Sequence, residues 1–206
     1  MAAPVKPSVI PIKEFTLNNW INIEFFKNIN LIFKKKLVTP DLYIKDLRNL
    51  DITLLKQKNI KGCAIDINQT IVAYDEDFIH DFIIEVVAKL KTNFNICAIS
   101  NYIGTSTDER SKFRKELVEK ILEIPVLTIP IKKPKQDIFN IIIEYFKVPS
   151  SNCAFIGDRI FTDVIGANMA GMFTILVDPI NIKNDPIYVS IPRKIEKFVS
   201  KLYRIF

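Results

Sequence analysis

The sequence is poor in residue types on which many enzymes depend. It has one histidine, His80, which excludes heme, histidine-based zinc clusters and a Ser-His-Asp triad that needs a spare histidine. Its three cysteines cannot all pair, which favours a reducing compartment inside the cell. No apolar run approaches the roughly 18–20 residues that span a bilayer, and the N-terminal residues lack the apolar block of a secretory signal. We therefore expect a protein that is soluble or lies at the surface of a membrane.

Positive charge is concentrated toward the two ends of the chain. The net charge is +6, yet residues 63–178 carry 12 Lys and Arg against 16 Asp and Glu. Residues 1–62 carry 11 against 5, and residues 179–206 carry 6 against 2. This distribution disfavours a uniformly basic face for nucleic acid, so no nucleic-acid partner is expected.

Both basic ends contain amphipathic segments. Residues 18–33 are rich in aromatic and aliphatic side chains and run into three lysines. After Pro192, apolar residues recur at helical spacing between lysines and arginines. Each segment either packs on the rest of the protein or lies on an anionic membrane surface. The chain is thus divided into an N-terminal arm with an amphipathic segment, a central α/β domain and a C-terminal basic amphipathic helix, over residues 1–36, 37–180 and 181–206.

The central part alternates between short apolar runs and helical patterns. Three of the runs begin with Cys-Ala and are apolar throughout, which is typical of parallel strands buried on both faces. Strands are predicted at 63–66, 97–100, 125–129, 153–158 and 173–177, and helices at 78–92, 109–123 and 135–147. The pattern predicts an α/β fold with a doubly wound, mostly parallel sheet and right-handed crossovers.

Polar residues gather where these strands end. The carboxyl ends of parallel strands face one crevice, where ligands bind in such sheets. The residues expected there are Asp66, Asn68, Thr70, Ser100, Asn101, Lys132, Lys133, Lys135, Asp158 and Asp163. Carboxylates are ligands that Mg²⁺ prefers, and lysine and hydroxyl groups bind phosphoryl oxygens. The sequence therefore predicts a site for a phosphate ester and Mg²⁺.

Four short segments carry a resemblance to a known superfamily. Asp66-Ile-Asn-Gln-Thr70 resembles the Asp-x-Asp-x-Thr motif of haloacid dehalogenase (HAD) phosphatases. Ser100, Lys133-Pro134 and Gly157-Asp-Arg-Ile-Phe-Thr-Asp163 resemble the three later motifs, in the family order. The sequence is most similar to the YqeG-like branch, which includes phosphatidylglycerophosphate phosphatases. No insertion large enough for a cap domain separates the first two motifs.

The resemblance implies a mechanism and a set of site residues. Asp66 is the implied nucleophile, which forms an aspartyl-phosphate that water then hydrolyses. The implied Mg²⁺ ligands are Asp66, the backbone carbonyl of Asn68, Asp158 and Asp163, the last through water unless it orients Lys133 instead. The implied substrate-binding residues are Thr70, Ser100, Asn101 and Lys133, of which Lys133 also counts as catalytic. The implied substrate is a lipid phosphate such as phosphatidylglycerophosphate.

Asn68 departs from the family pattern. The family has at this position an aspartate that protonates the leaving group and then activates water, and an amide can do neither. Three explanations stay open: a substitution in an active enzyme, a lineage that uses another acid, and a pseudophosphatase kept for binding. Candidate substitute acids are Asp75, Glu76 and Asp77, just after the first motif.

We therefore expect a Mg²⁺-dependent phosphomonoester hydrolase, impaired to the extent that proton transfer at residue 68 matters. The alternative is an inactive HAD-fold binding or scaffold protein at a membrane. The expected location is a reducing compartment, either the cytoplasm or an organelle, with peripheral attachment to a membrane.

Overall fold

The computed structural model describes residues 31, 33–101 and 109–205. Most of the predicted N-terminal arm, including nearly all of the amphipathic segment 18–33, lies outside the described residues. The three-part division of the chain stays a prediction.

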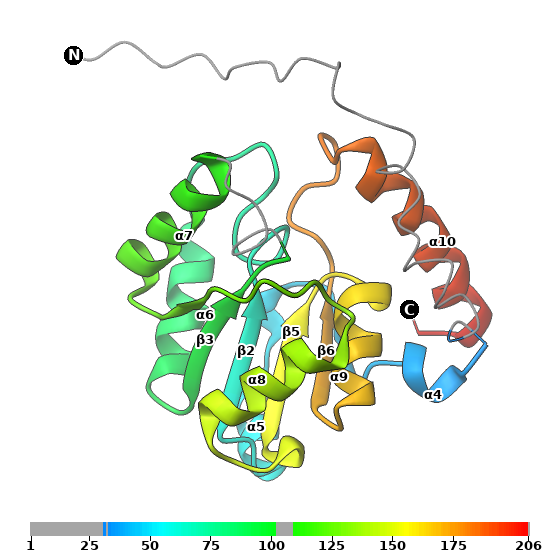
Figure 1. Cartoon of the computed structure of the whole chain (residues 1–206), viewed down its shortest axis with the longest axis horizontal. Coiled ribbons are helices and arrows are strands. Elements are labelled where there is room, and N and C mark those ends of the chain that lie inside the picture. The colour runs from blue at the N-terminus through cyan, green and yellow to red at the C-terminus, as the bar shows by residue number, and fades with distance from the viewer. Residues whose placement is uncertain (1–30, 32, 102–108, 206) are drawn as a thin grey trace.

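Six parallel strands form a single sheet in the described part of the chain (Figure 1). They are β1 (Leu42–Ile44), β2 (Gly62–Asp66), β3 (Asn95–Ile99), β4 (Val126–Leu127), β5 (Cys153–Gly157) and β6 (Phe173–Val177). Their order is β1-β6-β5-β2-β3-β4. The chain runs outward from β2 through β3 to β4 and then crosses to β5 on the other side. The order therefore reverses between β2 and β5, and ligands bind at such points in open α/β sheets.

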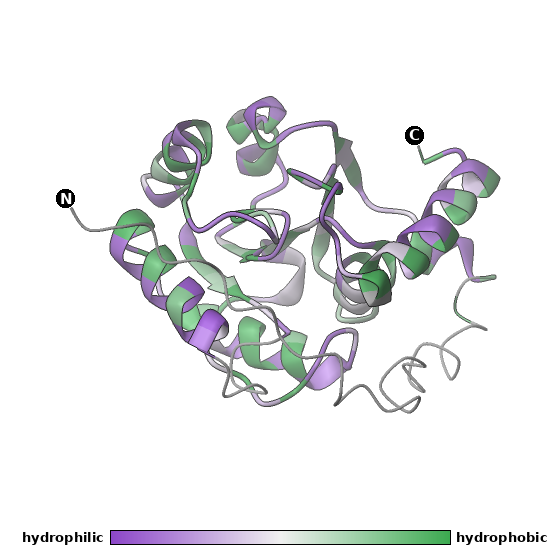
Figure 2. Cartoon of the chain, turned by 90° about the horizontal axis from the view of Figure 1, so that it is seen from above, coloured by the Kyte–Doolittle hydropathy of each residue, from purple (hydrophilic) through white to green (hydrophobic). Residues whose placement is uncertain are grey.

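Helices cover both faces of the sheet (Figures 1 and 2). They are α4 (Lys35–Val38), α5 (Ile52–Gln57), α6 (Asp81–Lys91), α7 (Glu109–Leu122), α8 (Gln136–Phe146), α9 (Ile165–Met169) and α10 (Ile187–Tyr203). Neighbouring residues of β2 enter different cores. Cys63 and Ile65 belong to the cluster that contains Val87 of α6, whereas Ala64 packs with Phe139 of α8. Burial on both faces explains why β2 is apolar up to its last residue, Asp66, and the predicted doubly wound parallel fold is confirmed.

The connection from β2 to β3 is short. Residues 67–80 form turns and a loop, and α6 then leads into β3. This connection, which lies within the described residues, contains no cap domain. No such insertion therefore covers the carboxyl ends of β2 and β3.

The structure differs from the sequence prediction in several short elements and in one helix boundary. The edge strand β1 and the short helix α5 were not predicted, because three and six residues are too few to show a clear hydrophobic period. Helix α10 begins at Ile187 rather than after Pro192, and Pro192 lies inside it. None of the helices in the described residues has the length and apolar character needed to cross a bilayer.

Candidate active site

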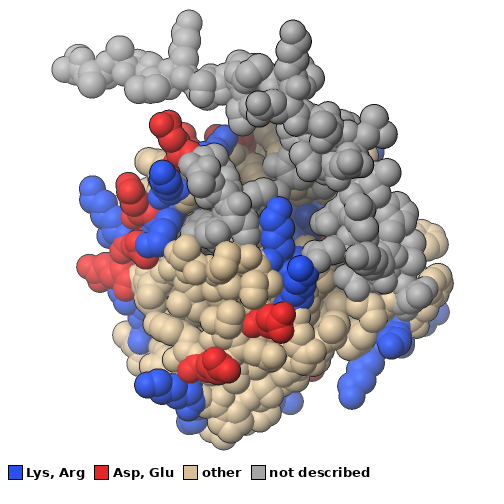
Figure 3. Space-filling model, viewed as in Figure 1, with Lys and Arg blue, Asp and Glu red and all other residues tan. Residues whose placement is uncertain are grey.

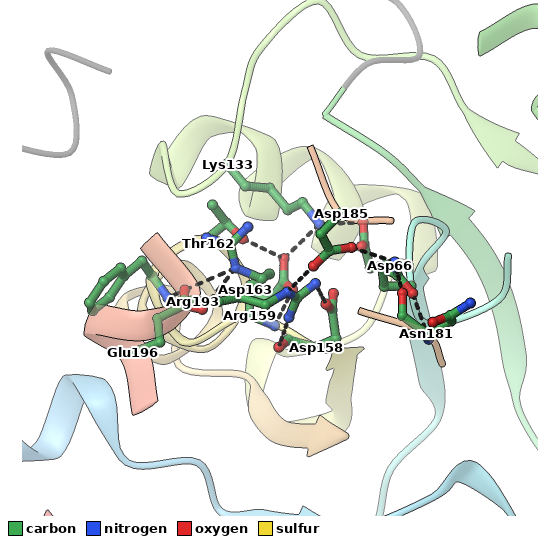
Figure 4. Close-up of polar contacts among 12 residues, drawn as sticks. Asp66, Lys133, Asp158, Arg159, Thr162, Asp163, Asn181, Asp185, Arg193 and Glu196 are labelled. Atoms are coloured by element: carbon green, nitrogen blue, oxygen red, sulfur yellow. Dashed lines mark hydrogen bonds and ion pairs between the residues drawn. The ribbon is translucent and has the colours of Figure 1, made fainter. Parts of the chain in front are cut away.

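Asp66 and Lys133 form a buried ion pair at the carboxyl end of β2. Asp66 is the last residue of this strand, and Lys133 lies in the loop between β4 and α8. The Lys133 Nζ donates to Asp66 Oδ1 at 2.6 Å and lies 2.6 Å from Asp163 Oδ1 (Figure 4). One ammonium thus connects the end of β2 with the helical turn that contains Asp163, and Lys133 is 4% exposed.

Three buried carboxylates lie together at this point. Asp66, Asp158 and Asp163 each offer a ligand oxygen, and these oxygens lie within 4.8 Å of one another. Asp158 follows β5 directly, and Asp163 belongs to the π-helical turn Ile160–Val164. Such a group of hard oxygen ligands matches the preference of Mg²⁺.

Gly157 makes room for this cluster. A Cβ at position 157 would lie 2.4 Å from Asp163 Oδ2, which is closer than real Cβ contacts allow. The same carboxylate oxygen accepts a hydrogen bond from the Arg159 backbone N–H at 3.0 Å. The missing side chain at Gly157 therefore lets Asp163 lie against the turn and face Lys133.

Burial sets the electrostatics of the cluster. Burial raises the pKa of Asp66 to about 7, with Lys133 lowering it and the neighbouring carboxylates Asp163 and Asp158 raising it further. Burial also raises the pKa of Asp158 to about 6, against the effect of Arg193. Burial lowers the pKa of Lys133, but Asp163 and Asp66 reverse this and hold it above its ordinary value. The positive charge of the neighbouring side chains is therefore too small to keep Asp66 and Asp158 at their ordinary pKa values. Lys133 itself stays protonated.

Asn68 is held between two side chains. Its Nδ2 donates to Ser100 Oγ at 2.9 Å, and its Oδ1 accepts from the Arg114 guanidinium. Arg114 is a buried residue of α7 that also donates to the backbone carbonyls of Ala73 and Tyr74, at 2.7 and 2.9 Å. The neutral amide of Asn68 thus faces the buried positive charge of Arg114.

Sequence reasoning missed Arg114. The signal was its helical phase, because Ser111, Arg114, Val118 and Leu122 are the buried residues of α7. An arginine in phase with buried apolar residues needs a buried partner.

Asn101 fixes the loop that carries Lys133. Its Oδ1 accepts from the Lys133 backbone N–H at 2.7 Å, and its Nδ2 donates to the Lys133 carbonyl at 3.4 Å. The structure therefore brings Ser100 and Asn101 to the same crevice as Lys133, as the strand-end argument expects.

Thr70 faces a different space. It is buried, and its hydroxyl has no hydrogen-bond partner among the described residues. It lines a neighbouring cavity of about 400 Å³ near the carboxyl ends of β1 and β6, together with Asp46, His80 and Asp178. The Thr70 hydroxyl therefore makes no hydrogen bond to the carboxylate cluster.

The C-terminal helix, for which the sequence leaves both packing on the protein and a membrane surface open, contributes a residue to the site. Arg193 of α10 binds Asp158 Oδ2 through Nη2 and Asp185 Oδ2 through Nε, the latter at 2.6 Å (Figure 4). The other oxygen of Asp185 accepts from Gln69 Nε2 at 2.6 Å. The predicted basic face of this helix thus loses Arg193, which points inward because two buried carboxylates bind it.

A second ion pair attaches α10 to the same turn. Glu196 accepts from Arg159 Nε at 2.8 Å and from the Phe161 backbone N–H at 3.0 Å. Arg159 therefore binds the helix as well as lining the site.

The three candidate substitute acids have other partners. Asp75 accepts from the amides of Asn181 and Asn184, Glu76 binds His80 at 2.8 Å, and Asp77 lies 3.7 Å from Arg110. A proton-transfer role for any of them stays a hypothesis.

Comparison with known proteins identifies the family. The sequence profile of the mitochondrial phosphatidylglycerophosphate (PGP) phosphatase family matches residues 23–181. The chain belongs to the PGP phosphatase family. This assignment confirms the resemblance that the four motifs indicate.

Individual relatives agree with this assignment. The probable phosphatase YqeG of Bacillus subtilis is 31% identical over 146 residues, which cover 71% of this chain and 80% of that protein. Phosphatidylglycerophosphate phosphatase 1, chloroplastic/mitochondrial, of Arabidopsis thaliana is 29% identical over 184 residues and 87% of this chain. The chain spans about half the length of that plant relative, 53%.

Among solved structures, an uncharacterised protein from Listeria monocytogenes serotype 4b matches 69% of this chain and 99% of its own, with 17% identity and a TM-score of 0.47.

Proposed function

We propose that this protein is a Mg²⁺-dependent phosphomonoester hydrolase that acts through a phosphorylated Asp66. The observation that carries the proposal is the buried Asp66 carboxylate, which ends β2 and lies 2.6 Å from the Lys133 ammonium, beside Asp158 and Asp163. A carboxylate is costly to bury unless a cation balances it. This arrangement suits a nucleophile that accepts a phosphoryl group.

The side chains have distinct roles in this proposal. Asp66 attacks phosphorus, so a new O–P bond forms while the bond from phosphorus to the alcohol oxygen breaks. Lys133 and Ser100 bind the phosphoryl oxygens. Asp163, at 2.6 Å from Lys133 Nζ, is a positioning residue for the lysine. Water then hydrolyses the acyl phosphate and frees Asp66.

The carboxylate cluster fits Mg²⁺. Its ligand oxygens lie within 4.8 Å of one another, and burial raises the pKa of both Asp66 and Asp158, as expected for carboxylates short of positive charge. The proposed ligands are Asp66, Asp158 and the backbone carbonyl of Asn68. When bound, the ion neutralises charge that develops on the phosphoryl group.

The proposed substrate is a lipid phosphomonoester, phosphatidylglycerophosphate. The name of the plant relative, phosphatidylglycerophosphate phosphatase 1, supports this choice. The short β2–β3 connection also suits it, because an uncapped crevice admits a headgroup that stays attached to a membrane. The words "chloroplastic/mitochondrial" in the name of that relative support an organelle as the location, and we propose that the protein is held peripherally at a membrane there.

Asn68 favours a second candidate, a scaffold that binds a phosphate ester without turnover. The amide donates to Ser100 and accepts from Arg114, so it fills the acid-base position without a transferable proton. Asp66 and Lys133 would still bind a phosphate ester in this case.

Phosphate release separates the two candidates. Purified protein, Asn68→Asp and Asp66→Asn are incubated with phosphatidylglycerophosphate in detergent micelles, with Mg²⁺ or with EDTA. The hydrolase proposal expects Mg²⁺-dependent release that Asp66→Asn abolishes. Release by Asn68→Asp alone identifies the scaffold, and no release from either protein overturns the phosphatase assignment.

A further inference from the structure

Helix α10 has one face on the site and another in solvent. Its inner face carries Arg193 and Glu196, which bind Asp158 and Arg159. Its outer face carries four apolar side chains that are exposed to solvent. These are Ile187, Ile191, Phe198 and Leu202, exposed to 52%, 46%, 67% and 56%. Their spacing of four, seven and four residues places them on one stripe of the helix.

The charges around this stripe have one sign. Lys194, Lys197 and Lys201 are exposed on α10, and Arg204 follows at its end. The single acidic residue of the helix, Glu196, is buried and bound to Arg159. Figure 2 shows hydrophobic and hydrophilic residues alternating along this helix. The outer face of α10 therefore combines exposed apolar side chains with positive charge that no acidic residue on the outer face of this helix balances.

We propose that the outer face of α10 docks on an anionic lipid bilayer. Apolar side chains enter the acyl boundary in such interfacial helices, while lysines bind the headgroups, each adding about fivefold to the partition coefficient. Nucleic acid would bind the lysines but would leave Phe198 and Leu202 in water. The combination of both features therefore favours lipid.

Docking through this face has a consequence for the site. Arg193, on the inner face of the same helix, binds Asp158, so the bilayer would lie one helix diameter from the carboxylate cluster. This consequence rests on the proposed function, because only a lipid substrate requires the crevice to reach the headgroups. The docking itself does not depend on turnover.

Helix α7 provides a matched control. It also exposes two large apolar residues, Phe113 and Ile121, each 42% exposed. Its charged residues, however, have both signs, and Figure 3 shows acidic and basic side chains together over this helix. A surface with this mixture should gain little from an anionic bilayer.

The test is co-sedimentation of the full chain with vesicles that contain no substrate. The vesicles consist of phosphatidylcholine alone or of phosphatidylcholine mixed with phosphatidylglycerol. We expect binding to the mixed vesicles only, and weaker binding at high salt. Lys194→Gln/Lys197→Gln/Lys201→Gln should weaken it by about 100-fold. Phe198→Ser/Leu202→Ser should weaken it by about tenfold or more, whereas Phe113→Ser/Ile121→Ser should bind as the parent does.

Several results would overturn the docking proposal. They are equal binding by the parent and both α10 variants, equal losses from the α7 and α10 variants, and salt-sensitive binding to DNA or RNA in place of vesicles. Circular dichroism confirms that each variant is folded. Phosphate release from a water-soluble phosphomonoester, measured in parallel, tests the chemistry separately, so docking and the proposed function can fail independently.

Discussion

The guanidinium of Arg193 binds the carboxylate of Asp158, although the two residues are 35 positions apart in the chain. A helix near the C-terminal end of the chain thereby supplies a cation to the carboxylate that follows β5. Arg193 also binds Asp185, which accepts a hydrogen bond from Gln69 of the first motif. The C-terminal helix is therefore part of the site, in addition to any role at a surface.

Replacement of Arg193 should change the affinity of the site for Mg²⁺. A guanidinium on Asp158 repels a nearby divalent cation, so Arg193→Gln should tighten Mg²⁺ binding by about tenfold. Isothermal titration calorimetry on the purified protein measures this affinity. Arg193→Lys is the control, because it keeps the charge and should bind Mg²⁺ as the parent does. Weaker binding by Arg193→Gln would show instead that Arg193 orients Asp158 for the ion.

The raised pKa values of Asp66 and Asp158 predict how stability depends on pH. In the folded protein these pKa values are about 7 and about 6, above the ordinary value of 3.8. Between the ordinary and the raised values the folded state binds more protons than the unfolded state, so the contribution of these groups to stability falls as pH rises. Without metal, this loss should extend from about pH 4 to about pH 7. Mg²⁺ should therefore raise Tm more at pH 8 than at pH 5.

Asp66→Asn isolates this effect. The variant lacks the titrating carboxylate. In EDTA, the Tm of the parent should therefore fall relative to the Tm of the variant as pH rises. Thermal denaturation at several pH values measures the difference. A difference that does not change with pH would contradict the raised pKa of Asp66.

Gly157→Ala should disturb the cluster of Asp66, Asp158 and Asp163 that we propose to bind Mg²⁺. The new Cβ would meet Asp163 Oδ2 at 2.4 Å and force this carboxylate away from Lys133 and from the Arg159 N–H. The cost should be about 1–3 kcal/mol in the free energy of unfolding, and the rise in Tm on Mg²⁺ addition should shrink. Gly62→Ala is the control, because its Cβ would meet the Phe146 ring at 2.5 Å at the other end of β2. It should destabilise the protein and keep the Mg²⁺ response.

The sequence predicted the centre of the sheet better than its edge. Runs such as Cys63–Ile65 are apolar throughout because both faces of β2 are covered, and this gives a strong signal. The edge strand β1 has only three residues, too few for a period to appear. The apolar spacing predicts the last helix only after Pro192, whereas α10 begins at Ile187 and contains Pro192.

The strand-end rule likewise predicted part of the site. Asp66, Asp158 and Lys133 follow or end strands whose carboxyl edges coincide, so topology alone brings them to one crevice. Arg114 and Arg193 reach the same crevice from helices, with side chains whose direction depends on how α7 and α10 pack. A sequence pattern does not contain that packing, and Arg193 looked like any other residue of a basic helix.

Asn68→Asp should restore proton transfer. General acid-base assistance is worth about 10²–10⁴-fold, so phosphate release should rise by that range. The new carboxylate would face Arg114, which now donates to Asn68 Oδ1, and this opposite charge should lower its pKa. Ser100 can reverse its role and donate its hydroxyl proton to the carboxylate, so the existing contact at 2.9 Å survives.

Arg114 can then be tested through the pH profile. In the Asn68→Asp background, Arg114→Gln removes the facing charge and should move the acidic limb of the pH-rate profile to higher pH. Steady-state phosphate release across the pH range measures the shift, and circular dichroism confirms that the buried substitution leaves the protein folded. An unshifted limb would place the proton-transfer group elsewhere. Equal rates for the parent and Asn68→Asp would lead to the same conclusion, because residue 68 would then have no part in the step that limits turnover.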